Sequence, residues 1–182
     1  PNKNIILENK IKFLYVGRLE KVKNIINIID AILLTGNTID IYGDGSLRPY
    51  IQEKYQTPIA EKKVSLMGIV SNNELAKIYQ RYDFYILMSL TEGMSKTLLE
   101  AMTSGLICVV SDIPQNTCMV VDGETGITVK GFTADAIKNK INHINLYNLQ
   151  NISENAANYA ANNFSLEVIG KNEIENINVF IR

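Results

Sequence analysis

Two positively charged side chains follow the first apolar segment of the chain, and their types suit the binding of a diphosphate. Arg18 comes directly after an apolar run that ends at Gly17, and Lys23 lies at the start of the next helical segment. Arginine offers a planar fork of donors and lysine a compact point charge, and both pair with phosphate oxygens. An alternative stays open here, namely a solvated basic turn that pairs with Glu20.

A pair of glutamates in a Glu-x7-Glu spacing forms the second candidate element. Glu92 lies in a turn that contains Gly93, and Glu100 lies about one turn into a helix that begins near Ser95. The free backbone N–H groups and the dipole of a helix start favour phosphate, and carboxylates accept hydrogen bonds from sugar hydroxyls. Both glutamates can therefore face one crevice that binds a sugar or ribose. Alternatively, Glu100 is a surface residue and Glu92 a favourable helix cap.

Two glycine-containing turns follow the next two apolar segments. They are Gly43-Asp44-Gly45 and Gly68-Ile69-Val70. Because glycine lacks a β-carbon, the backbone of either turn can come close to a nucleotide base. Both are also ordinary turn sequences, so this alternative stays open as well.

The elements that must position these turns alternate between short apolar runs and helical segments. Strands that are apolar on both faces are typical of a parallel sheet covered by helices, and right-handed crossovers bring the strand-to-helix turns to its carboxyl edge. We predict a doubly wound, Rossmann-like α/β fold with helices on both faces. Ser71 or Asn72, with Glu74, is expected to cap one helix, and the segment through Pro114 is expected to be a loop. The predicted strands are 11–16, 39–42, 64–67, 83–88, 106–110 and 126–129, and the predicted helices are 24–34, 47–55, 71–80, 97–103, 134–146, 150–163 and 165–178.

The bulk composition narrows the classes of function. The 182 residues are 46% hydrophobic and carry a net charge of −1, which gives no basic face for nucleic acid. We therefore expect one domain, residues 1–182, and no nucleic-acid partner. His143 is the single histidine, so histidine-based metal sites and Ser-His-Asp triads are poorly supported. No apolar run approaches the roughly 20 residues of a membrane-spanning helix, and Cys108 and Cys118 are expected to be reduced.

A set of short segments, in a fixed order along the chain, carries a resemblance to a known family: Val16-Gly17-Arg18-Leu19 with Lys23, Gly43-Asp44-Gly45, Gly68-Ile69-Val70, Ser89 to Gly93, Glu100-Ala101-Met102, Gly105, Ser111-Asp112, and Val121-Asp122-Gly123 with Gly126. Together they resemble the C-terminal domain of family-4 (group 1) glycosyltransferases. Those enzymes have the GT-B fold of two facing Rossmann-like domains. The resemblance covers roughly residues 11–165 and implies the C-terminal half of such a fold.

The resemblance also implies a role for each candidate residue. Arg18 and Lys23 would clamp the donor diphosphate, Glu92 would complete the catalytic set by contacting hydroxyls of the donor sugar, and Glu100 would bind the ribose. The other substrate-binding residues would line the base pocket or bring backbone close to the sugar and phosphates: Gly17, Gly43, Gly45, Ile69, Gly93, Met94, Ser95, Lys96 and Thr97.

The chain departs from the family pattern in three places. Asn24 stands where a glycine commonly follows the lysine, Met94-Ser95 replaces a frequent Phe-Gly, and Cys118 stands where an acidic residue is common. The first two bear on loop shape or donor preference. None of the three removes a charged group from the clamp.

The implied reaction transfers a sugar from a nucleoside diphosphate, with UDP as the base-rate expectation, to an acceptor hydroxyl with retention. The expected setting is bacterial polysaccharide or glycolipid synthesis. No Asp-x-Asp pair is present, so we expect a metal-independent site with no cofactor besides the nucleotide-sugar donor. A nucleotide-sugar epimerase of GT-B fold and a non-catalytic nucleotide-binding module are the alternatives.

Further expectations concern the rest of the protein. The acceptor-binding N-terminal domain is expected to be absent from this chain, which alone would bind the donor without transferring the sugar. The expected location is cytoplasmic, at the inner face of the membrane, with peripheral membrane contact made through that missing domain.

Overall fold

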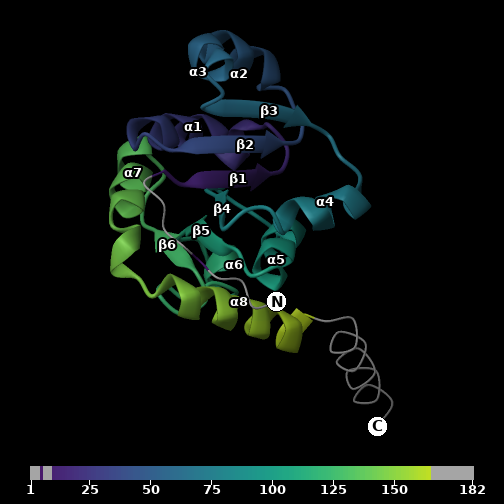
Figure 1. Cartoon of the computed structure of the whole chain (residues 1–182), viewed down its shortest axis with the longest axis vertical. Helices are drawn as coiled ribbons and strands as arrows, with labels where there is room; N and C mark the ends of the chain where they lie inside the picture. Colours follow the sequence, from purple (N-terminus) through teal and green to yellow (C-terminus); the bar gives the residue numbers. More distant parts are fainter. Residues whose placement is uncertain (1–4, 6–9, 165–182) are drawn as a thin grey trace.

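The computed structural model describes residue 5 and residues 10–164, which form a parallel sheet with helices on both faces (Figure 1). The strand order is β3-β2-β1-β4-β5-β6, and every neighbouring pair is parallel. The chain therefore runs outward from β1 to β3, returns to β4 beside β1, and continues to β6, which confirms the predicted doubly wound fold. The strands are β1 (Lys12–Val16), β2 (Thr38–Tyr42), β3 (Val64–Gly68), β4 (Phe84–Leu87), β5 (Ile107–Ser111) and β6 (Ile127–Val129).

The helices cover the sheet in packed pairs. α1 (Ile25–Leu34) packs against α7 (Ala134–Asn142), and α5 (Lys96–Thr103) packs against α8 (Leu149–Phe164) (Figure 1). The connection from β1 to β2 and the connection from β4 to β5 step across the sheet in opposite directions. Because both crossovers are right-handed, their helices α1 and α5 lie on opposite faces. The shorter helices are α2 (Arg48–Lys54), α3 (Gln56–Ala60), α4 (Asn72–Tyr79) and α6 (Pro114–Thr117), and the 3-10 turns are η1 (Lys21–Lys23) and η2 (Ile144–Leu146).

The core lies on both sides of the central strands. Every residue of β4 and β5 is buried, which explains their nearly continuous apolar sequences. In α1 the buried positions follow helical spacing and include Ile25, Ile28, Ile29 and Ile32. The hydrophobic periodicity of the chain thus fixes which side of each element faces inward.

The sequence pattern does not predict α3 and α6, and α7 ends earlier than predicted. α3 follows α2 almost without a break, and α6 occupies part of the segment through Pro114 that we predicted as a loop. The helix predicted over 134–146 ends at Asn142 and continues as η2. The capping box at Ser71 is confirmed, because the Ser71 hydroxyl accepts the Glu74 N–H and the Glu74 carboxylate accepts the Ser71 N–H. The helix predicted over 165–178 lies outside the described residues.

Asn24 accounts for one departure from the family pattern. Its backbone adopts the left-handed conformation with φ of 57° between η1 and α1. Asparagine tolerates this region better than other residues with a side chain, so it can take the place of a glycine. Its side chain is buried and its Nδ2 donates to the carbonyl of Phe132 at 2.8 Å, which ties the turn to the loop before α7.

Candidate functional site

The loops after β1, β2 and β3 meet at the carboxyl edge of the sheet. Gly17 N–H donates to the carbonyl of Tyr42 at 3.0 Å, and Gly43 N–H donates to the carbonyl of Gly68 at 2.7 Å. These bonds continue the strand pairing into the loops and bring the predicted base-pocket residues side by side. A hollow of about 270 Å³ lies between the loops and is lined by Val16, Gly17, Arg18, Tyr42, Gly43, Asp44, Ile69, Val70 and Leu75.

Gly43 and Gly45 are needed for the packing of these loops. Gly43 has a φ of 136°, and a β-carbon there would lie 1.9 Å from the carbonyl oxygen of Gly17. A β-carbon on Gly45 would lie 2.6 to 2.8 Å from backbone atoms of Leu19. Gly43 also lines the hollow, whereas Gly45 lies among the residues that hold the β1 and β2 loops together. The glycine pattern thus has a steric cause within the fold itself.

Lys23 and Glu92 come together in a nearly buried ion pair. The Lys23 Nζ lies 2.5 Å from Glu92 Oε1, and the two side chains are 16% and 8% exposed. Their loops are joined by a hydrogen bond of 2.8 Å from the Leu90 N–H to the carbonyl of Val22. The structure therefore unites two groups of the predicted catalytic set, from η1 and from the loop after β4.

Arg18 lies at the same edge with its side chain exposed. Beneath it, the Tyr15 hydroxyl donates to the Arg18 carbonyl at 2.9 Å. Burial raises the pKa of Tyr15, and the nearby Glu92 carboxylate raises it further, while the Arg18 guanidinium acts in the opposite direction. Arg18 and Glu92 therefore act on one buried phenol from two loops. Glu20, which we considered as a partner for the cations, instead accepts hydrogen bonds from the N–H and hydroxyl of Ser46.

The start of α5 supplies the remaining predicted residues. Ser95 is the N-cap, and its hydroxyl accepts the Leu98 N–H. Thr97 is anchored through its hydroxyl, which lies 2.9 Å from that of Tyr85. Met94 is 70% exposed, and a β-carbon on Gly93 would meet no atom within 4 Å in the described part of the chain. The fold therefore leaves the segment before α5 open to solvent.

Glu100 lies farther along α5, and its closest partners differ from those of Glu92. Its carboxylate accepts a hydrogen bond of 3.2 Å from the Tyr79 hydroxyl and pairs with Lys96 at 3.4 Å. It borders a second hollow of about 450 Å³ between α4, α5 and α8, rather than the hollow beside Arg18. The Tyr79 hydroxyl also lies 3.2 Å from the carbonyl oxygen of Thr97, which links Glu100 to the helix start.

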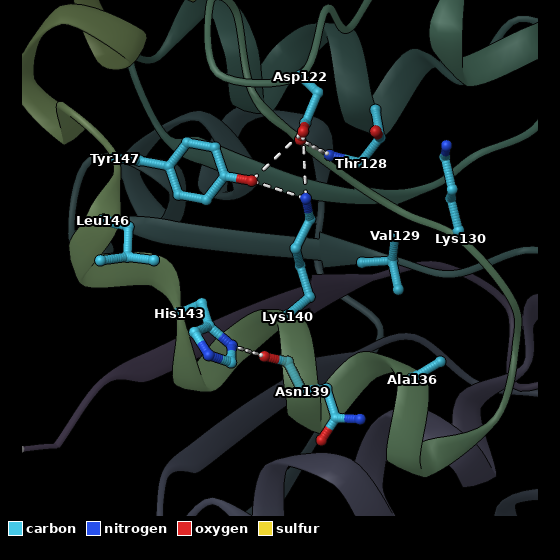
Figure 2. Close-up of a pocket in the computed structure, with 10 residues that line it drawn as sticks. All are labelled: Asp122, Thr128, Val129, Lys130, Ala136, Asn139, Lys140, His143, Leu146 and Tyr147. Atoms are coloured by element: carbon cyan, nitrogen blue, oxygen red, sulfur yellow. Dashed lines mark hydrogen bonds and ion pairs between the residues drawn. The ribbon is translucent and has the colours of Figure 1, made fainter.

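A larger hollow, of about 610 Å³, lies beside β6 and α7, away from the predicted residues (Figure 2). Its central feature is Asp122, whose Oδ2 lies 3.1 Å from Lys140 Nζ and 3.3 Å from the Tyr147 hydroxyl. Asp122 Oδ1 accepts the Thr128 N–H at 2.8 Å. These contacts tie the loop before β6 to α7 and η2, and they satisfy both carboxylate oxygens within the chain.

The described residues contain neither a metal-binding cluster nor a membrane-spanning helix. Within that part of the chain, His, Cys, Asp and Glu nowhere gather as three groups able to hold a metal ion. Among the same residues, every helix is too short or too polar to span a bilayer. Metal independence stays a prediction.

Comparison with known proteins identifies the family. Residues 1–164 match the family described as "Glycosyl transferases group 1". The chain belongs to this family. It is 32% identical over 167 residues to the UDP-Gal:alpha-D-GlcNAc-diphosphoundecaprenol alpha-1,3-galactosyltransferase of Escherichia coli, which covers 87% of this chain and 43% of that protein. It is also 32% identical over 131 residues to the UDP-N-acetylglucosamine--peptide N-acetylglucosaminyltransferase GtfA subunit of Streptococcus pneumoniae serotype 4, covering 69% of this chain and 25% of that protein.

This group 1 glycosyltransferase chain therefore spans less than half the length of these curated relatives. Its fold matches solved members of GT-B architecture. The pneumococcal O-GlcNAc transferase GtfA, solved with UDP and GlcNAc, superposes with a TM-score of 0.78 at 26% identity, covering 93% of this chain and 36% of that one. The C-terminal domain of a group 1 protein from Francisella tularensis has a TM-score of 0.72 at 19% identity and covers 86% and 87%, respectively, which supports the fold alone.

Proposed function

We propose that this chain is the donor-binding domain of a retaining glycosyltransferase, and that the carboxyl edge of its sheet binds a UDP-sugar. The observation that carries the proposal is the meeting of Lys23 and Glu92, from loops far apart in sequence, at the sheet edge where Arg18 is exposed. A cation and a carboxylate held together suit a ligand with both phosphates and sugar hydroxyls. The relatives' names, which specify UDP-galactose and UDP-N-acetylglucosamine, support UDP as the nucleotide.

The two cations have a direct chemical role in this proposal. Transfer breaks the bond between the anomeric carbon and the diphosphate, so negative charge grows on the departing diphosphate. Arg18 and Lys23 stabilise that charge more in the transition state than in the bound donor, which accelerates the step. The backbone N–H groups at the start of α5 add to this field. Glu92 orients the sugar through its hydroxyls, and an α-linked donor gives an α-linked product.

The hollow lined by Gly17, Gly43 and Ile69 is the proposed base pocket. Ile69 is 78% exposed and can cover one face of a base. The neighbouring Gly43 keeps the pocket floor free of side chain. Glu100 is proposed to reach the ribose from α5, which requires its carboxylate to leave Lys96 or to share it with the ligand.

We further propose that acceptor binding belongs to sequence outside this chain, because the curated relatives are more than twice as long as the region they share with it. The domain alone is then expected to bind the donor without transferring its sugar. Polysaccharide or glycolipid synthesis in the cytoplasm, at the membrane surface, is the setting we propose.

Calorimetric titration with uridine, UDP, GDP and ADP tests this proposal. We expect UDP to bind at least tenfold more tightly than uridine, since a hydrogen bond to a charged group is worth about 1.5–3 kcal/mol. Arg18→Ala should weaken the binding of UDP more than that of uridine, because Arg18 lines the proposed base pocket and also faces the diphosphate in this proposal. Equal binding of UDP and uridine to the wild-type chain would exclude a diphosphate clamp.

A second test separates transfer from epimerisation in the longer protein that contains this domain. A transferase consumes UDP-sugar only when an acceptor is present, whereas an epimerase converts UDP-sugar alone. We expect no change in the NMR spectrum of UDP-galactose or UDP-N-acetylglucosamine without acceptor, and an α-linked product with it. Conversion without acceptor would favour the epimerase.

A further inference from the structure

We propose that Ser89, Ser111 and Asn116 form a positioning chain that holds the Glu92 carboxylate in the orientation needed to bind the donor sugar. The inference deepens the proposed function and rests on it. None of these three residues belongs to the predicted substrate-binding set. Ser89 bonds Glu92 directly, whereas Ser111 and Asn116 act on it through their neighbours.

The contacts of Glu92 fall on one of its two oxygens. Oε1 accepts a hydrogen bond of 2.6 Å from the Ser89 hydroxyl and pairs with Lys23 Nζ. Within the described residues Oε2 has no hydrogen-bond partner, and it is not among the buried polar atoms that lack one. The carboxylate is therefore fixed through Oε1, while Oε2, in a side chain that is 8% exposed, has no partner among the described residues and is not fully buried. An oriented acceptor of this kind suits a sugar hydroxyl.

Ser89 is in turn fixed by Ser111. The Ser111 hydroxyl donates to the Ser89 carbonyl at 2.7 Å, across the ends of the paired strands β4 and β5. This bond places the backbone from which the Ser89 side chain projects. A shift of that backbone moves the hydroxyl that holds Glu92.

Asn116 completes the chain from α6. Its Nδ2 lies 3.0 Å from the Ser111 hydroxyl oxygen and 3.2 Å from the Ser111 carbonyl oxygen. Because the Asn116 amide donates to the Ser111 hydroxyl oxygen, the Ser111 proton is left to point at Ser89. The whole sequence of donors therefore runs in one direction, from Asn116 toward Glu92.

The three side chains of the positioning chain are fully buried, so their hydrogen bonds add little net stability to the fold. Ser89, Ser111 and Asn116 are each 0% exposed. Buried polar side chains gain little net stability from their hydrogen bonds, and apolar residues of similar size serve a core equally well. Ser89 is the informative member because its hydroxyl bonds a carboxylate at the ligand edge, whereas a core serine such as Ser153 bonds a backbone carbonyl.

The inference predicts an effect on the sugar and not on the nucleotide. Oε2 of Glu92 would contact the sugar, so misplacing it should reduce the gain in affinity from UDP to UDP-sugar. The binding of UDP itself depends on Arg18, Lys23 and the base pocket. The ratio of the dissociation constants of UDP and UDP-sugar therefore isolates the role of the positioning chain.

The test measures this ratio by calorimetry with UDP, UDP-galactose and UDP-N-acetylglucosamine. We expect Ser89→Ala to lower it about fivefold and Ser111→Ala to lower it about threefold, as expected for a lost hydrogen bond to a charged group and a weaker indirect effect. The matched control is Ser153→Ala, which removes an equally buried hydroxyl that is 2.6 Å from the Gly105 carbonyl oxygen. It should leave the ratio unchanged.

A double-mutant cycle separates positioning from general damage to the fold. With Glu92→Gln as the background, Ser89→Ala should change the ratio no further, because the group it positions is already altered. Ser111→Ala provides the same answer from a more distant site if Ser89→Ala does not fold. Thermal unfolding identifies any variant that has lost the fold.

The outcomes distinguish this inference from the proposed function. If neither UDP nor UDP-sugars bind the wild-type chain, the donor-binding proposal fails. If UDP binds but the sugars add no affinity, or if Ser89→Ala and Ser111→Ala keep the wild-type ratio, the positioning chain is overturned while nucleotide binding stands.

Discussion

Two lysine–carboxylate pairs in this domain have the same chemistry and different surroundings. Lys23 and Glu92 join two loops at the carboxyl edge, with side chains 16% and 8% exposed. Lys140 and Asp122 join α7 to the loop before β6, with side chains 24% and 42% exposed (Figure 2). Asp122 is bonded through both oxygens within the chain, whereas among the described residues the bonds of Glu92 all fall on Oε1.

This difference indicates how to tell a binding group from a structural one. A pair whose acceptors are all satisfied internally contributes to folding and offers nothing to a ligand. A nearly buried pair with an open acceptor costs desolvation that its own contacts do not fully return. The larger hollow beside β6 is thus the less informative one, and the smaller hollow at the carboxyl edge carries the proposed function.

The largest expected effect is a loss of folding stability when a glycine of the site loops is replaced, compared with a glycine near Asp122. Gly43→Ala should lower the free energy of unfolding by about 3 kcal/mol or more, because its β-carbon would lie 1.9 Å from the Gly17 carbonyl oxygen at a φ of 136°. Gly123→Ala should cost only about 1–2 kcal/mol, because its β-carbon would touch the Tyr147 ring at 3.5 Å at a φ of 79°. Urea denaturation measures both, and equal losses would contradict the close crossing of the site loops.

The next effect concerns nucleotide affinity. Lys23→Ala should weaken UDP binding by about 10²-fold, because the variant loses a cation and leaves Glu92 unpaired beside the phosphates. Lys140→Ala, in the other region, should leave UDP affinity within about twofold of wild type, because its contacts serve the fold. Calorimetry on both variants tests the comparison. A similar loss in the two would mean that Lys23 acts only through stability.

The smallest effect is a difference in the pH dependence of the two regions. Hydrogen bonds from the Ser46 hydroxyl and N–H lower the pKa of Glu20 in the site loops. Burial alone would lower the pKa of Lys140, but its hydrogen bonds to Tyr147 and Asp122 outweigh burial and raise it. The contribution of Glu20 is therefore present above the ordinary glutamate pKa and lost as the pH falls through the lowered one. That of Lys140 is present below the ordinary lysine pKa and lost as the pH rises through the raised one.

Denaturation of wild type, Glu20→Gln and Lys140→Met across a pH series measures these contributions. The difference between wild type and Glu20→Gln should shrink below pH ~4, and that between wild type and Lys140→Met should shrink above pH ~10. Differences that stay constant over both ranges would contradict the assigned partners.

The fold was predictable because its strands are apolar on both faces and alternate with helical periodicity. The two unpredicted helices lack those signals. α3 has five residues with Pro58 among them, and α6 has four residues that start with Pro114. α6 is joined to the end of β5 by hydrogen bonds from Asn116 to Ser111, five residues earlier, a side-chain contact that hydrophobic periodicity does not reveal.

The sequence predicts which loops lie at the carboxyl edge of the sheet. It does not predict which side chains of these loops pair with one another. Parallel strands bring their carboxyl ends to one edge, which is why Arg18, Lys23 and Glu92 were expected to be neighbours. The choice of Glu92 as the partner of Lys23, and of Ser46 as the partner of Glu20, depends on side-chain geometry between loops distant in sequence. Asn24 was the one departure whose left-handed backbone could have been inferred, since it replaces a glycine.

A crystal structure of the chain with UDP tests the central claim most directly. The account predicts that the base occupies the hollow between Gly17, Gly43 and Ile69 and that the diphosphate lies within hydrogen-bond distance of Arg18 and Lys23. The contrary result would be UDP bound elsewhere, for example in the hollow beside Lys140, or bound at the carboxyl edge with its phosphates directed away from both cations.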